Sequence, residues 1–177
     1  MGTAKTAKTE QAVRPSRRPR DMALSLVVLL VPVVLVVGLY RVLGGDTPPA
    51  VDAGPVVAQA RAGAGFPVLV PTVDWRVASA TYREEGGGAT LRIGYVTPSR
   101  GGAQLIESSM PADALLAREL GERPQLTGTV PVAGQDWQRY SAREGETALV
   151  RTESNRTIIV IGRAPDAELV TLASSLG

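Results

Sequence analysis

The residues of this sequence that could do chemistry are mainly aromatic and arginine side chains in its C-terminal two-thirds. Aromatic rings offer a large contact area, and arginine meets anionic groups. Seven of them form a candidate interaction surface: Trp75, Tyr82, Tyr95, Trp137, Arg139, Tyr140 and Arg151. The alternative is that the aromatic residues pack in the core or on a sheet face, while Arg139 and Arg151 join Glu153 in a cross-strand ion pair. We favour this alternative, which needs no new assumption, and keep the surface as a candidate.

The composition excludes several kinds of catalysis. The chain has no cysteine and no histidine, and no lysine follows Lys8. Disulfides, thiol nucleophiles and cysteine zinc sites are therefore excluded. The usual general base near neutral pH and the commonest transition-metal ligand are missing as well, as are Schiff-base lysines beyond residue 8. We predict no catalytic residue, no cofactor and no metal site.

Carboxylates are the remaining candidates for catalysis or metal binding. Glu84 and Glu85 stand beside three consecutive glycines, which favours a solvated turn over a pair of catalytic acids. Three further acids lack the regular ligand spacing of a calcium loop: Asp136, Glu144 and Glu146. A small hydrolase that uses carboxylates alone stays an alternative.

Hydrophobic periodicity predicts the elements that position these residues. Extended runs at 75–84 and 89–97 flank a glycine-rich turn, which is typical of a hairpin. Further strands are expected at about 103–108, 129–132, 136–143, 147–153 and 157–162, and helices at 111–120 and after Pro165. The last strand, TIIVIG, is apolar on both faces and should be central, and Ser109 is the expected N-cap of the first helix. The predicted fold is α+β, with a mainly antiparallel sheet and about two packed helices over 66–177.

The run MALSLVVLLVPVVLVVGLY, from Met22 to Tyr40, contains no charged residue. Its 19 residues would form a helix of roughly 28 Å, close to the roughly 30 Å of a bilayer core. Six Lys and Arg residues precede the run and only Arg41 follows closely, so the positive-inside rule places the N-terminus in the cytoplasm. A cleaved signal peptide is the competitor, but its apolar region is usually shorter and Leu39-Tyr40-Arg41 is a poor cleavage site.

These observations divide the chain into four parts. We expect a basic cytoplasmic tail (1–21), a transmembrane anchor (22–43), a flexible Gly/Pro/Ala stalk (44–65) and an extracytoplasmic domain (66–177). Within the stalk, VVAQARA at 56–62 is compatible with a short helix, but it lacks the length to be stable alone. Residues 1–20 carry a net charge of +5, whereas the chain from Gly44 onward carries −3. A mildly acidic domain has no electrostatic footprint for nucleic acid, so no nucleic-acid partner is expected.

Two stretches carry a resemblance to a known family. They are Arg-Asp-Met-x-x-Ser at 20–25, and Val-Ala-Gly-x-x-Trp at 132–137 with Tyr140. Over nearly its whole length the chain resembles domain-of-unknown-function family 4245, an uncharacterised actinobacterial family. That resemblance implies a single-span envelope protein with an exported C-terminal domain, and it supplies no activity, substrate or catalytic residue. The C-terminal half is also similar to sensor domains of some membrane-bound anti-sigma factors.

The expected function is a non-catalytic, membrane-anchored interaction or ligand-binding domain of the bacterial cell envelope. Its partner would be the membrane together with an envelope protein, a lipid or a glycan, and the sequence does not choose among these. Two alternatives remain: the carboxylate-dependent hydrolase, and an accessory sensor for a signalling partner.

Overall fold

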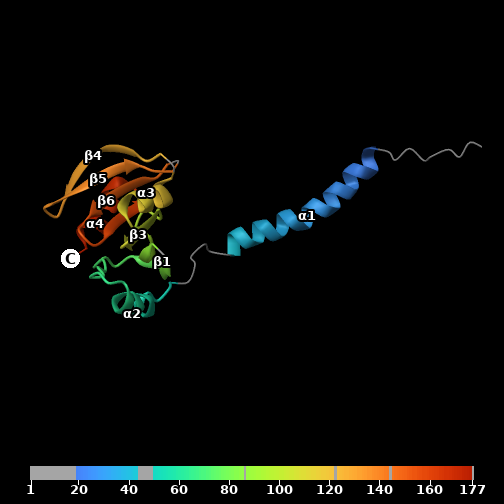
Figure 1. Ribbon diagram of the computed structural model, residues 1–177. Helices are drawn as coiled ribbons and strands as arrows, with labels where there is room; N and C mark the ends of the chain where they lie inside the picture. Colours follow the sequence, from blue (N-terminus) through green and yellow to red (C-terminus); the bar gives the residue numbers. More distant parts are fainter. Residues whose placement is uncertain (1–18, 44–49, 86, 122, 144, 177) are drawn as a thin grey trace, which may run out of the picture. The chain divides into compact units, whose positions relative to one another are not determined.

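The computed structural model describes residues 19–43, 50–85, 87–121, 123–143 and 145–176 (Figure 1). The chain divides into two compact units, Met1–Thr47 and Pro48–Gly177. Three sequence-based expectations lie outside the described residues: the tail over 1–18, the stalk over 44–49 and the calcium candidate Glu144.

The described part of the first unit is helix α1 (Pro19–Leu43), which contains Pro32. Its side chains are described from Leu26 to Leu39, and the large apolar ones among them are exposed. Among the described residues, no helix is long and apolar enough to cross a membrane. The transmembrane anchor expected over 22–43 gains no support from that finding and stays a prediction.

The second unit is a seven-stranded sheet with three helices (Figure 1). The strand order is β1-β2-β3-β7-β6-β5-β4, and each neighbouring pair is antiparallel. The bounds are α2 (Gly54–Gly63), β1 (Arg76–Glu85), β2 (Gly88–Val96), β3 (Gly102–Ser108), α3 (Ala112–Leu120), β4 (Gln125–Val132), β5 (Gln135–Ser141), β6 (Thr147–Thr152), β7 (Thr157–Gly162) and α4 (Asp166–Ser174). This confirms the predicted α+β class with an antiparallel sheet. Strand β7, apolar on both faces, is the middle strand, as predicted.

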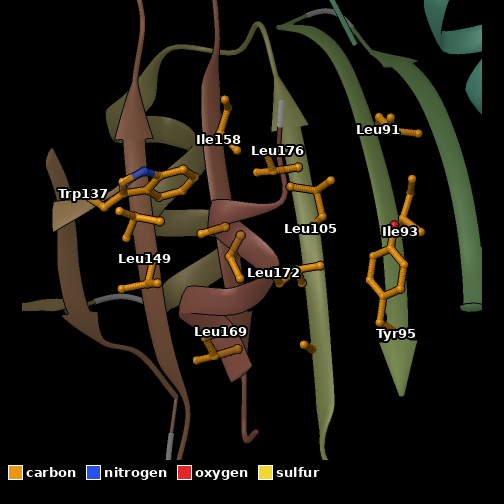
Figure 2. Packing of buried hydrophobic residues seen from close by; sticks show 14 of the residues in the cluster. Leu91, Ile93, Tyr95, Leu105, Trp137, Leu149, Ile158, Leu169, Leu172 and Leu176 are labelled. Atoms are coloured by element: carbon orange, nitrogen blue, oxygen red, sulfur yellow. The ribbon is translucent and has the colours of Figure 1, made fainter. Parts of the chain in front are cut away.

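Each face of the sheet is covered by helix. Because strand residues alternate between faces, neighbours such as Leu105 and Ile106 belong to different cores. Helices α2 and α4 pack on the face that carries Leu105, and α3 packs on the face that carries Ile106. Figure 2 shows the α4 leucines facing the apolar side chains of the sheet, with Leu169 and Leu172 among them. Both residues lie in the helix that was predicted after Pro165.

Ser109 has a different role from the one predicted. Helix α3 begins after Pro111, and no described side chain caps its N-terminus. Instead, the Ser109 hydroxyl accepts a hydrogen bond from the Ala89 N–H at 3.0 Å, which fastens the end of β3 to the β1–β2 hairpin. The start of β2 lies close to the segment that follows β3: a Cβ on Gly88 would lie 2.8 Å from the Met110 nitrogen, and Gly88 has a φ of 135°. Glycine is therefore required here.

The stalk expected over 44–65 is wrong for its described part, because residues 54–63 form α2. Val57 and Ala60 of this helix are 7% and 0% exposed and belong to the core under α4. The Val51 N–H also donates to the Val77 carbonyl of β1 at 3.0 Å. A ten-residue helix is marginal alone, and packing against the sheet supplies the stability that its own length does not. The second unit therefore begins near Pro48 rather than at residue 66.

We expect Ala60→Glu to detach α2, because it places an unpaired carboxylate in the core at a cost of about 3 kcal/mol or more. Trypsin cleavage after Arg61 of the full chain should then be at least about tenfold faster, as followed by mass spectrometry. Ala58→Glu, at an exposed position of the same helix, is the matched control and should leave the rate unchanged. Equal rates for the two variants would contradict the packing of α2.

Candidate functional site

The aromatic members of the predicted interaction surface lie mostly inside the fold. Trp137 is fully buried and Tyr95 is 5% exposed, both in the core beneath α4 (Figure 2). Trp75 and Tyr82 are half-buried against the same core, and Tyr140 packs on the opposite core beneath α3. The aromatic residues therefore do not gather on one exposed surface, which agrees with the core interpretation.

The two arginines of that surface have separate partners. Arg139 of β5 forms an ion pair with Asp166 at the start of α4. Arg151 of β6 pairs with Glu153 at 2.7 Å, and its guanidinium lies 5.0 Å from the ring centre of Trp137, as in a cation–π contact. Neither contact is the expected cross-strand pair: Arg151 and Glu153 are two residues apart along one segment, and Arg139 pairs with Asp166 of α4 instead of Glu153.

A buried ion pair joins β3 to the turn before β7. Glu107 is fully buried, and its Oε2 lies 2.9 Å from Nη1 of Arg156, whose side chain is 6% exposed. Glu107 also accepts hydrogen bonds from the Leu69 N–H, while Arg156 donates to the Pro67 carbonyl and, through Nε, to Glu153 at 2.7 Å. The pair thus fixes the segment between α2 and β1 onto the sheet.

This pair was not among the residues predicted from the sequence. The signal in the sequence was Glu107 itself, an acidic residue among apolar ones in the strand AQLIES. A carboxylate that is buried in such a strand requires a partner. The partner, Arg156, lies 49 residues further along the chain. Only the order of the strands brings the two together.

The network shifts the pKa values of its members. Burial raises the Glu107 pKa, and the hydrogen bonds from Arg156 and Leu69 oppose this without cancelling it. Burial and the charge of Glu107 raise the Tyr95 pKa to about 12. For Glu153, burial acts upward, but the hydrogen bonds and charges of Arg156 and Arg151 outweigh it and lower the pKa.

We expect Glu153→Gln to weaken the acid sensitivity of the fold. A carboxyl whose pKa is lowered by folding adds stability above its unfolded pKa of about 4.5 and loses that contribution as the pH falls through the folded pKa. The free energy of unfolding of the unmodified chain should therefore approach that of the variant below about pH 4.5. Urea unfolding of both chains at a series of pH values measures this difference. A difference that is constant with pH would contradict the lowered pKa.

The face of the sheet that carries α3 contains an open concavity of about 260 Å³, which we call the groove. Its floor is formed by strands β2, β3 and β7, which contribute Gly94, Gly102, Ala103 and Gly162 to the lining. Its polar lining residues come from β3, from α3 and from the loop between β5 and β6: Gln104, Glu119, Arg143 and Glu146. One member of the predicted surface, Tyr95, lines the groove, although its side chain belongs to the core on the other face of the sheet.

Both described carboxylates of the groove have arginine partners. Glu119 pairs with Arg92, and its Oε1 lies 3.5 Å from Nε of Arg118. Glu146 has Nε of Arg163 at 4.0 Å. Hydrolysis by two carboxyl groups needs one acid and one free base on either side of the bond that breaks. Two carboxylates that already face guanidinium groups do not supply such a pair.

A second concavity, of about 150 Å³, lies between α4 and strands β4 to β6, and we call it the apolar pocket. Its walls come mostly from aliphatic side chains: Val130, Leu149, Leu169 and Val170, with Thr147 beside them. Arg139 and Asp166, the ion pair described above, complete its lining. Of the seven residues of the predicted surface, Arg139 alone lines this pocket.

No group of three or more acidic residues in the described chain could hold a metal ion.

The fold and these two concavities define a small α+β domain whose accessible carboxylates in the groove and pocket are already paired. The chain belongs to a family of proteins of unknown function, DUF4245, whose model matches residues 14–176. No curated protein and no solved structure matches the chain.

The structure explains one of the two stretches that carried this resemblance. Val132 and Gln135 face each other across the β4–β5 hairpin, so Ala133 and Gly134 form a two-residue loop. Both have positive φ angles, 48° and 77°, as a tight hairpin turn of this length requires. The loop sets the register that directs Trp137 into the core.

Proposed function

We propose that this chain is a membrane-tethered, non-catalytic binding protein of the bacterial cell envelope, with the second unit outside the cytoplasmic membrane. The observation that carries the binding role is the groove, an open concavity lined by polar side chains from β3, α3 and the loop between β5 and β6. Concave surfaces with a few converging polar groups are the usual places for ligands. The actinobacterial source and the single span implied by the resemblance belong to this proposal as well.

The tether rests on the sequence of the first unit. An uncharged run of 19 residues follows six basic ones, and basic residues stay on the cytoplasmic side. The large apolar side chains of α1 are exposed between Leu26 and Leu39. Burying them in lipid would stabilise the helix, whereas leaving them in water would be costly.

The absence of catalysis is supported by where the acidic side chains lie. Glu107 has a raised pKa, as many catalytic acids do. It is fully buried, however, and its carboxylate already pairs with Arg156 and accepts a hydrogen bond from the Leu69 N–H. A substrate would have to displace the segment 67–69 to reach it. The groove is open to a substrate, but its carboxylates face arginines.

Photo-crosslinking in the native membrane tests the binding role. A benzoylphenylalanine at Gly102 would point into open space, because a Cβ there meets nothing within 4 Å, and this residue lines the groove. Gln135, exposed at the β4–β5 hairpin and absent from the groove lining, is the matched control. We expect a dominant adduct at position 102 and none at 135. A protein, lipid or glycan mass then names the ligand, and equal labelling at both positions would contradict the proposal.

The topology gives a separate prediction. Protease added outside intact spheroplasts should digest the second unit, since the positive-inside rule places it outside. Immunoblots with an antibody against the C-terminal segment measure its loss. If the segment survives while control ectodomains are cut, the proposed orientation is wrong.

A further inference from the structure

The apolar pocket has the size of a small organic group. Its volume of about 150 Å³ equals that of an engineered protein cavity that stays dry and binds benzene. Leu149 and Leu169 are buried in its walls, and Val130 and Val170 are half-buried. A branched aliphatic or phenyl body of about six heavy atoms would fit there and would exclude water from these side chains.

The charged residues of the pocket determine which charged groups the ligand must carry in addition to its apolar body. Arg139 and Asp166 both line the pocket and pair with each other, with side chains 39% and 52% exposed. An incoming carboxylate would compete with Asp166 for the guanidinium, and an incoming ammonium would compete with Arg139 for the carboxylate. A ligand with one charge therefore leaves one protein group without its partner, which costs binding energy.

We propose that the apolar pocket binds a small zwitterion with an apolar body, of the chemical class of free apolar α-amino acids. The ligand carboxylate pairs with Arg139 and its ammonium pairs with Asp166, so both protein charges exchange one partner for another. The side chain of the ligand fills the space between α4 and strands β4 to β6. Charge-assisted hydrogen bonds at both ends supply orientation, and burial of the apolar body supplies the remaining affinity.

This site is separate from the groove. The pocket is lined from the face covered by α4, whereas the groove is lined by Glu119 of α3 and by Ile161, which belongs to the core on the other face. The proposal therefore goes beyond the binding role assigned to the groove. If the chain crosslinks through position 102 but binds no amino acid, the proposal for the pocket is refuted and the binding role of the groove is retained.

The first test compares three probes that share one aliphatic body: L-leucine, 4-methylpentanoate and 3-methylbutylamine. Each is titrated into the full chain in detergent micelles, and saturation-transfer NMR on the ligand methyl groups gives the dissociation constant. We expect L-leucine to bind at least about tenfold more tightly than either single-charged probe, the factor expected when one charged hydrogen bond is lost. Equal affinities for all three, or no binding of L-leucine at millimolar concentration, would overturn the proposal.

The second test uses variants whose selectivity separates binding from structure. Arg139→Gln should bind 3-methylbutylamine as well as L-leucine, and Asp166→Asn should bind 4-methylpentanoate as well as L-leucine. Val170→Phe fills the pocket and should abolish binding of all three probes. Arg163→Gln, which removes an exposed arginine facing Glu146, is the matched control and should behave as the unmodified chain does. Tryptophan fluorescence confirms that each variant is folded, and unchanged selectivity in both charge variants would refute the assignment.

Discussion

Replacing Arg156 by Met is expected to destabilise the second unit by about 3–5 kcal/mol, because it leaves the Glu107 carboxylate buried without a cation. Glu107 keeps the Leu69 N–H, which is too little to compensate a charge with no solvent contact. The same change removes the donors to the Pro67 carbonyl and to Glu153. Urea unfolding of the full chain in detergent measures the loss. Both tryptophans, Trp75 and Trp137, lie in the second unit, so their fluorescence follows its unfolding.

Two further variants separate the buried charge from the loss of a side chain. The double variant Glu107→Leu/Arg156→Met removes both charges and should recover much of the stability, because an apolar pair often replaces a buried ion pair at little cost. Arg163→Met removes an arginine of which 70% of the side chain is exposed and should change stability by less than about 0.5 kcal/mol. If Arg156→Met costs no more than Arg163→Met, the buried pair does not hold the fold.

This ion pair also marks the limit of what the sequence could reveal. Six of the strands and the helices α3 and α4 follow from local periodicity, because each buries a stripe or a face that its own residues define. Strand β4 (Gln125–Val132) was predicted only over 129–132, because residues 125–129 are all exposed and define no buried face. Strand β7 could be placed at the centre because TIIVIG has no polar face. Which residues meet across the sheet depends on strand order, and periodicity does not contain that order. The pairing of Glu107 with Arg156 therefore could not be predicted.

The same reasoning explains the error at α2. The segment GPVVAQARAG is rich in small residues and is too short for a stable isolated helix, so composition predicts a stalk. Its apolar positions Val57 and Ala60 acquire their role only from the uncovered part of the sheet beside β1 and β2. Both concavities were missed for a related reason. The groove combines five elements and one loop, and the apolar pocket combines four elements, so no single motif indicates either.

The arginines and aromatic residues were chosen from the sequence for their chemistry, and the structure distributes them over different tasks. Arg139 lines the apolar pocket, whereas Arg151 lies over Trp137 and belongs to the buried network through Glu153. Residue type alone does not distinguish these roles. The partners do: Asp166 lies on a helix at the surface, and Glu153 lies beside a buried arginine.

Trp137→Ala should cost about 3–5 kcal/mol, the usual loss when a large aromatic side chain is removed from a core. The indole is fully buried, and it packs among the residues of β6, β7 and α4. Its removal also leaves the Arg151 guanidinium without the ring that it covers. Unfolding followed by circular dichroism measures the loss without relying on the deleted fluorophore.

Trp137→Phe should cost clearly less than Trp137→Ala, for two reasons. Phenylalanine keeps an aromatic face under Arg151, and it removes the indole N–H, which is buried without a hydrogen-bond partner among the described residues. Loss of that unpaired donor offsets part of the lost packing, since an unsatisfied buried polar group costs about 1–3 kcal/mol. Equal destabilisation by the two variants would mean that the shape of the indole, rather than its apolar area and its cation contact, holds β5 against α4.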